Sequence, residues 1–130
     1  MTKEPSITAL AEPRSIRVLA IVLGVVLGGG GLSKLASQST QVSHFIGWGL
    51  PHWFLLLVGT FEAIGGVLLA APGSRPVGSL ILSTIMVGAL WTHVVHAEWL
   101  DAFPVVIVLA LLLVVFRSTR GRAIQLLGGA

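Results

Sequence analysis

The chain alternates long apolar runs with short polar segments, and its charged residues lie mainly in the polar segments. A helix needs roughly 20 residues to cross about 30 Å of hydrocarbon, so each run suits a membrane-spanning helix. We expect Trp99 and Arg117, at the two membrane interfaces, to complete the short last run. The pattern predicts an all-α integral membrane protein, an antiparallel four-helix bundle. The runs cover about residues 18–33, 53–71, 77–96 and 102–116.

The segments between the runs predict the rest of the architecture. Residues 35–50 carry apolar side chains between Ser, Thr and Gln, a pattern typical of an interfacial helix, and Pro51 ends it. Residues 72–76 form a tight connection between the second and third runs. The expected division is a tail at 1–13, a four-span transmembrane domain over 14–118 and a second tail at 119–130.

The composition excludes a soluble domain. Of the 130 residues, 55% are hydrophobic and only 10% are charged, with a mean hydropathy of +0.96. A soluble domain carries about 25% charged residues. The chain contains no cysteine, which excludes disulfides, thiolate metal sites and a thiol-based redox step by its own residues. The pI of about 10.7 does not indicate a nucleic-acid partner, because the basic residues stand in short groups beside the apolar runs.

Small residues recur at helical spacing in the first three runs. Helices in lipid pack closely where small residues let their backbones approach. We therefore expect the first three spans to form the tight core. The fourth, rich in Val, Leu and Ile, is expected to face membrane lipids or other membrane protein subunits. The rows are Gly24, Gly28 and Gly31; Gly59, Ala63, Gly66 and Ala70; and Thr84, Gly88 and Thr92.

Glu62 is the one acidic residue inside an apolar run. It lies roughly 14 Å into its helix by helical rise, near the bilayer midplane. An acid there costs about 2.5 to 3.5 kcal/mol, so we expect it to face the bundle interior and to mark a functional site. The alternative is a structural ion pair or hydrogen bond that sets helix register. Lys34 ends the first span, and it either reaches inward toward Glu62 or extends to the outer headgroups.

Histidines also concentrate at the outer side. His93 and His96 are three residues apart on one helical face, and His44 and His52 lie in or beside the first outer segment. Such a pair can bind a metal ion or haem. We nevertheless predict no metal site, because Lys34 would repel a cation, no thiolate is available, and neighbouring tryptophans indicate an aromatic interface belt.

These residues predict an outward-facing funnel for the polar head of an amphipathic ligand. Lys34, His93 and His96 are expected at its mouth, and Glu62 at its floor. We assign no catalytic residue.

Several short motifs stand in a fixed order along the chain: Gly-Gly-Leu-Ser-Lys34, Gly-Leu-Pro51, Val-Gly-Thr-Phe-Glu62-Ala-Ile-Gly-Gly66, Pro72-Gly-Ser-Arg75 and His93. With these motifs the sequence resembles the DoxX-like family of small four-span membrane proteins, over roughly residues 15–118. The resemblance implies an association with membrane redox systems or, in distant relatives, with the assembly or trafficking of other membrane proteins.

Two classes of function follow from this combination. The first is a non-catalytic accessory or anchor subunit of a membrane redox complex, in which Lys34 or a histidine holds a quinone or lipid head group and Glu62 relays a proton. The second is a membrane partner or assembly factor that is not an enzyme. In that class Glu62 only stabilises the bundle, and the fourth span carries the protein contact.

The distribution of Lys and Arg predicts the topology. Cytoplasmic loops are enriched in these residues, and an even number of spans places both termini on the same side. The split is seven to one, so both termini are expected in the cytoplasm and the protein in the inner cell membrane as a multi-pass protein. One side holds Lys3, Arg14, Arg17, Arg75, Arg117, Arg120 and Arg122, and the other holds Lys34.

A reporter enzyme that works only in the periplasm tests this orientation. Fused after Arg122, it is expected to stay inactive, whereas the same reporter inserted after Glu98 is expected to be active. Activity at the first position and none at the second would reverse the orientation.

Overall fold

The computed structural model describes residues 12–128 as a helical bundle without strands in that range. Four of its helices are long and apolar enough to cross a membrane, which confirms the predicted all-α membrane fold. Most of the predicted amino-terminal tail, including Lys3, lies outside the described residues. The helices are α2 (Arg14–Leu35), α3 (Ser39–Gly47), α4 (His52–Ala70), α5 (Arg75–Val95) and α6 (Trp99–Gly128).

The boundaries refine two sequence predictions. The short helix α3 lies between the first two spans, inside the predicted interfacial segment 35–50. The fourth helix extends beyond the predicted run 102–116 at both ends, because α6 begins at Trp99 and continues past Phe116. The helix continues to Gly128, within the segment predicted as the second tail.

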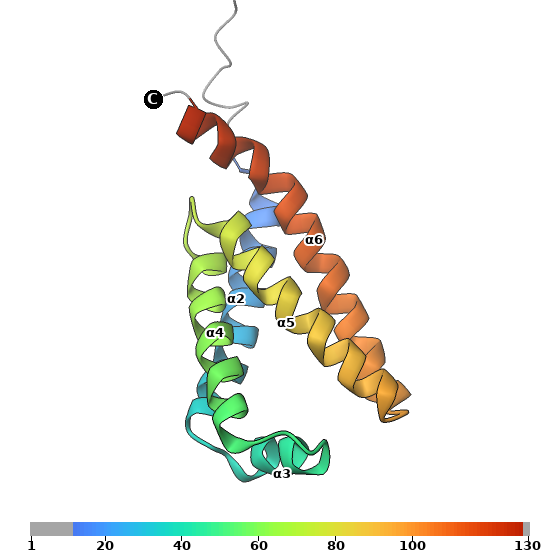
Figure 1. Ribbon diagram of the computed structural model, residues 1–130. Coiled ribbons are helices and arrows are strands. Elements are labelled where there is room, and N and C mark those ends of the chain that lie inside the picture. Colours follow the sequence, from blue (N-terminus) through green and yellow to red (C-terminus); the bar gives the residue numbers. More distant parts are fainter. Residues whose placement is uncertain (1–11, 129–130) are drawn as a thin grey trace, which may run out of the picture.

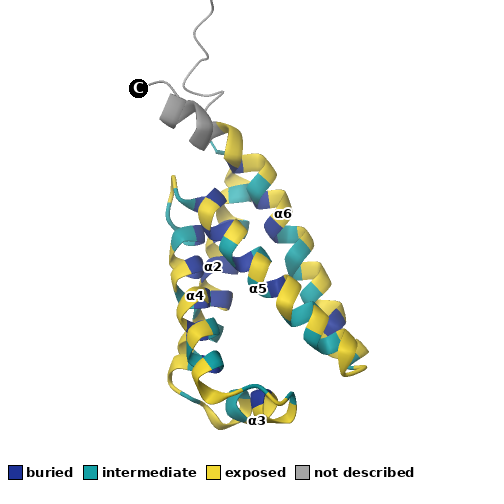
Figure 2. Ribbon diagram, in the orientation of Figure 1, coloured by how far each residue is buried: buried dark blue, intermediate teal, exposed yellow. Residues whose placement is uncertain are grey.

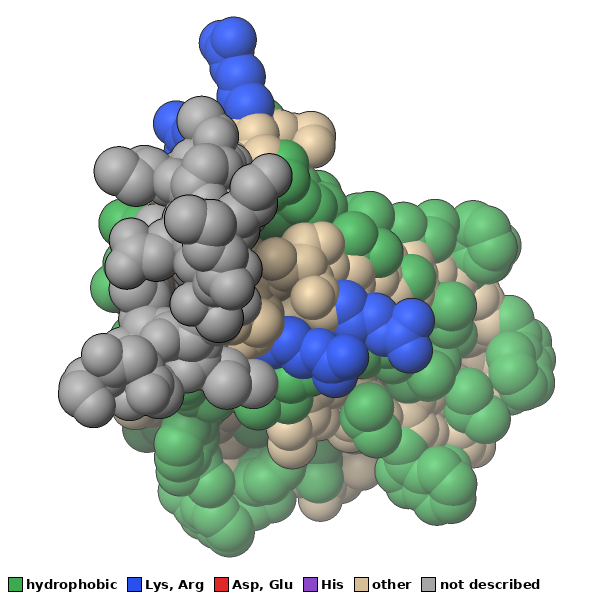
Figure 3. Space-filling view, turned by 90° about the horizontal axis from the view of Figure 1, so that it is seen from above, with side chains coloured by type: hydrophobic (Ala, Val, Ile, Leu, Met, Phe, Trp, Pro, Cys, Tyr) green, Lys and Arg blue, Asp and Glu red, His purple; other side chains and the backbone are tan. Residues whose placement is uncertain are grey.

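The long helices form two packed pairs, α2 with α4 and α5 with α6, and α4 joins the pairs by packing against α5. The beginning of α2 and the end of α6 lie at the same end of the bundle, while α3 lies at the opposite end (Figure 1). Toward α3, the α5–α6 pair diverges from the α2–α4 pair. Lys and Arg side chains lie on the end where α2 begins and α6 ends (Figure 3), as expected from the sequence.

The α2–α4 contact depends on glycine. A Cβ atom added to Gly31 would lie 2.5 Å from the Ala63 amide nitrogen and 2.7 Å from the Gly59 carbonyl oxygen. One added to Gly66 would lie 2.7 Å from the Gly24 carbonyl oxygen. These backbones are therefore too close for any side chain, which confirms the first two rows of small residues as a packing surface.

The third row of small residues, Thr84, Gly88 and Thr92 on α5, does not pack against a neighbouring backbone in this way. A Cβ added to Gly88 would meet nothing within 4 Å, and the Thr84 and Thr92 hydroxyls donate to backbone oxygens of their own helix. Instead α5 approaches α4 at Gly78, which lies against the backbone of Leu69 and Gly65. The expectation that this row belongs to the tight core was wrong, because close contact between α5 and α4 occurs in an earlier part of α5.

The apolar core occupies the half of the bundle nearer the termini. Its fully buried members include Leu69 late in α4, Leu82 early in α5, and Leu112 and Val115 in α6 (Figure 2). The same half is tied together by an ion pair from Arg75, whose Nη1 lies 2.9 Å from Glu12 Oε2. The half nearer α3 is more loosely filled, and it contains the candidate site.

A matched pair of glycine substitutions tests the α2–α4 contact. Gly31→Ala is expected to destabilise the bundle by about 1–3 kcal/mol, because the methyl group meets backbone atoms that move only if the helices separate. Gly29→Ala meets open space and is expected to be neutral or to stabilise by up to about 1 kcal/mol through helix propensity. Unfolding of both variants in detergent gives the comparison. Equal effects would refute a specific close contact at Gly31.

Candidate functional site

An ion pair joins α2 to α4 inside the bundle. Lys34 Nζ lies 2.8 Å from Glu62 Oε2, and the exposed fractions of the two side chains are only 14% and 5%. Lys34 thus reaches inward, one of the two arrangements that the sequence left open. Because an isolated charge is costly at this depth, each partner removes the penalty that the other would impose.

Two glycines make room for this pair. A Cβ atom at Gly59 would lie 2.8 Å from the Cβ of Lys34, and one at Gly30 would lie 3.0 Å from Glu62 Oε1. The absence of side chains at these positions lets the Lys34 stem lie against α4 and the carboxylate lie against α2. The same close approach that packs the helices therefore positions the ion pair.

Beside the ion pair is a cavity of about 700 Å³ between the two helix pairs. Helix α3 contributes to its wall together with the other four helices. The lining is mainly apolar and aromatic, and its polar groups are few. Apolar lining residues include Phe45, Trp48, Phe54, Val58, Ile85 and Met86, and polar ones include Lys34, Gln41, His44, Glu62, Thr92, His93 and Asp101.

The structure separates the two histidines that the sequence placed together. His93 lines the cavity, whereas His96 is exposed and its Nδ1 lies 2.8 Å from the Thr92 carbonyl oxygen of its own helix. His96 is not among the cavity-lining residues. Lys34, Glu62 and His93 therefore share one cavity. His44 also lines it, stacked against Trp48.

A second polar contact links α3 to the α5–α6 turn. Trp48 Nε1 donates a hydrogen bond of 2.9 Å to Glu98 Oε1, and His93 Nδ1 lies 3.1 Å from the same oxygen. The Trp48 hydrogen bond lowers the pKa of the Glu98 carboxyl; partial desolvation opposes this shift and His93 adds to it. Glu98 therefore stays ionised and holds α3 against the turn.

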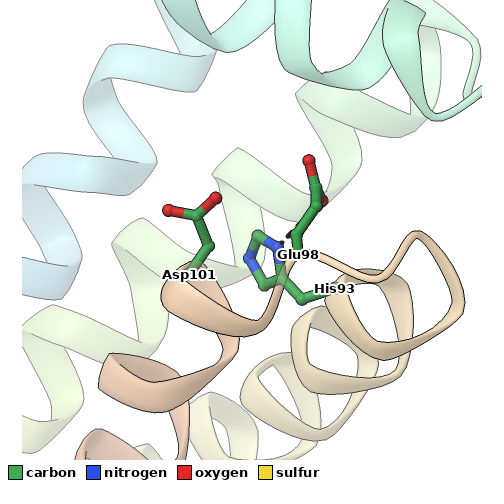
Figure 4. A group of neighbouring side chains, drawn as sticks. All are labelled: His93, Glu98 and Asp101. Atoms are coloured by element: carbon green, nitrogen blue, oxygen red, sulfur yellow. Dashed lines mark hydrogen bonds and ion pairs between the residues drawn. The ribbon is translucent and has the colours of Figure 1, made fainter.

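Asp101 completes a group with His93 and Glu98 (Figure 4). One potential ligand atom from each residue lies within 4.8 Å of the others. Glu98 and Asp101 are not among the site residues expected from the sequence. Their short spacing from His93 could have indicated this group. A tight turn after a helix folds the following residues back toward the last helical turn.

This arrangement suits recognition of an amphipathic molecule. The apolar walls can hold a ring or chain, the ammonium group of Lys34 carries three N–H donors, and Glu62 can accept a proton or a hydrogen bond. The described lining residues include no cysteine.

Residues 18–116 match the model of the DoxX-like family. No curated protein and no solved structure matched the chain.

A double-mutant cycle tests the ion pair. Lys34→Met or Glu62→Leu alone leaves a buried charge without its partner and is expected to cost about 3–5 kcal/mol of stability. The double variant is expected to be more stable than the sum of the single effects predicts. Glu62→Gln, which keeps the shape and a hydrogen-bonding oxygen, is expected to lose less than Glu62→Leu.

Unfolding in detergent measures these free energies. Thr60→Val is the control on α4, because the Thr60 hydroxyl is exposed and bonds only to its own helix at Leu56. Strictly additive effects of the Lys34 and Glu62 substitutions would show that the pair contributes no coupling energy.

Proposed function

The chain belongs to the DoxX-like family, and we propose that it is a non-catalytic subunit of a membrane redox complex whose cavity holds the head group of a quinone. The observation that carries the proposal is the mainly apolar cavity of about 700 Å³ with one buried ion pair in its wall. Its volume falls in the range of ligand sites, about 300–1,000 Å³.

The charge of the site favours a neutral head group. Lys34 and Glu62 neutralise one another at 2.8 Å, so together they present donors and acceptors without net charge. A carbonyl oxygen can accept a hydrogen bond from Lys34 without breaking this pair. A phosphate would instead compete with Glu62 for Lys34 and would bring a second negative charge close to the carboxylate.

The described residues fit a quinone in three respects. Phe54, Ile85 and Met86 offer apolar surface for the ring, Lys34 offers a donor for a carbonyl oxygen, and Glu62 offers a group that holds a proton. A bound quinone would supply the electron chemistry, which the side chains of a chain without cysteine do not. Glu62 would then hold or pass the proton, and Lys34 would orient the head group.

The wall of the cavity provides a selective test. Gly88 lines the cavity, and a Cβ atom there would meet nothing within 4 Å, so Gly88→Leu is expected to fill the space without disturbing helix packing. It is expected to weaken binding of a short-chain ubiquinone at least about tenfold, since displaced apolar contacts contribute most of the affinity. Gly29→Leu adds the same side chain at an exposed glycine on α2 and is expected to have no effect.

The binding assay uses purified protein in nanodiscs with a titration of the ubiquinone. A phospholipid as competitor distinguishes the two head groups, because displacement of the quinone by a phosphatidyl lipid would point to a lipid site. Wild-type protein that does not bind the quinone would contradict the proposal. That result would favour the alternative function, a membrane partner or assembly factor in which the exposed face of α6 contacts another membrane protein.

Lys34 and His96 provide a further comparison. Lys34→Ala is expected to weaken quinone binding more than His96→Ala, because Lys34 lines the cavity and carries a fixed charge, whereas His96 lies outside the lining. The double variant Lys34→Ala, Glu62→Ala serves as the folding control, since it leaves no unpaired buried charge. If that double variant binds the quinone like the wild type, Lys34 and Glu62 do not hold the head group.

A further inference from the structure

The α5–α6 turn brings one imidazole and two carboxylates together at the rim of the cavity. His93 stands in the last turn of α5, Glu98 in the connection and Asp101 in the first turn of α6 (Figure 4). Their potential ligand atoms lie within 4.8 Å of one another. His93 and Asp101 also line the cavity.

The backbone holds this group in place. The Glu98 amide donates to the His93 carbonyl oxygen at 2.8 Å, and the Ala97 amide donates to Val94 at 3.1 Å. These bonds close the end of α5 as a Schellman turn, with Ala97 at a φ of 55°. Glu98 is thereby fixed beside His93, so little conformational freedom remains to be lost when a ligand binds these side chains.

The charges of the group are unbalanced. Glu98 and Asp101 are two carboxylates, and His93, which lies 3.1 Å from Glu98, is the one basic side chain in the group. The Asp101 side chain forms no ion pair or hydrogen bond with any residue that the structure describes. Lys34, the lysine that lines the cavity, is already paired with Glu62. Because Glu62 neutralises Lys34, Lys34 does not repel a metal ion at this group in the way that the sequence suggested.

We propose that His93, Glu98 and Asp101 bind a divalent transition-metal ion, with Zn²⁺ as the best match. Imidazole and carboxylate are established Zn²⁺ ligands, and two carboxylates balance its charge. Zn²⁺ ligands lie about 2.0–2.2 Å from the metal and hence no more than about 4.4 Å apart. The three ligand atoms therefore have to move slightly closer together, and Asp101 is the exposed member of the group.

Trp48 supports such a site from α3. Its indole nitrogen donates to Glu98 Oε1, the oxygen that also lies near His93, and this leaves Oε2 for a metal ion. Hydrogen bonds of this kind orient the ligands of a metal and increase its affinity. Three protein ligands leave at least one coordination position for water or another molecule, as in zinc sites that stay open. The inference is independent of the proposed quinone, because it concerns the rim of the cavity alone.

Metal binding is measured by titrating purified, chelator-treated protein in detergent with Zn²⁺, and with Co²⁺, whose visible absorption reports coordination. One equivalent per chain is expected. Asp101→Asn and Glu98→Gln are each expected to weaken the affinity at least about tenfold, and Trp48→Phe about 10- to 100-fold as a supporting contact. Asp101→Asn is the decisive variant, because Asp101 makes no contact whose loss would unfold the chain.

His96→Ala and His52→Ala are the matched controls, since both are exposed histidines at the same end of the bundle, outside the group and outside the cavity lining. They are expected to bind Zn²⁺ like the wild type. The proposal is overturned if the wild-type protein binds neither Zn²⁺ nor Co²⁺. It is also overturned if folded Asp101→Asn and Glu98→Gln bind the metal as tightly as the wild type. Loss of binding in either control would likewise place the metal elsewhere.

Discussion

The close approach of α2 to α4 is the constraint on which the remaining structure depends. In a bilayer, two apolar helices gain little by burying apolar surface, so they associate through close packing of their backbones. At Gly31, Gly59 and Gly66 the backbones are too near for a Cβ atom. This contact carries Lys34 to Glu62, so that packing and charge neutralisation are achieved by the same surface. Neither charge would be tolerated if the helices moved apart.

The division of the bundle into a packed half and an open half follows from where small residues meet. Gly78 brings α5 against α4 near the end that carries the termini, and the apolar core fills that half. Farther along α5, a Cβ atom added at Gly88 would meet nothing within 4 Å, and Gly88 lines the cavity instead of packing against another helix. Helix α3 closes part of this space, held by the hydrogen bond from Trp48 to Glu98.

The open half contains two polar centres with different electrostatic properties. Deep between α2 and α4, Lys34 and Glu62 cancel one another, which suits a neutral, hydrogen-bonding head group. At the α5–α6 turn, Glu98 and Asp101 add their charges, which suits a cation. Because both centres border one cavity, an ion at the turn would also stabilise the position of α3 through Glu98 and Trp48.

The sequence by itself determined the four spans, the helix between the first two, the paired rows of small residues on α2 and α4, and the inward position of Glu62. Each of these depends on local hydropathy, helical periodicity or the cost of charge in lipid, all of which one helix displays alone. Only the tertiary structure decided that Lys34 turns inward, that Gly88 faces a cavity, that His96 lies apart from His93, and that Asp101 joins His93. Periodicity shows which residues share a helical face. It does not show which neighbouring helix packs against that face, or at which position along the helix axis. Both depend on contacts between segments that are distant in the chain.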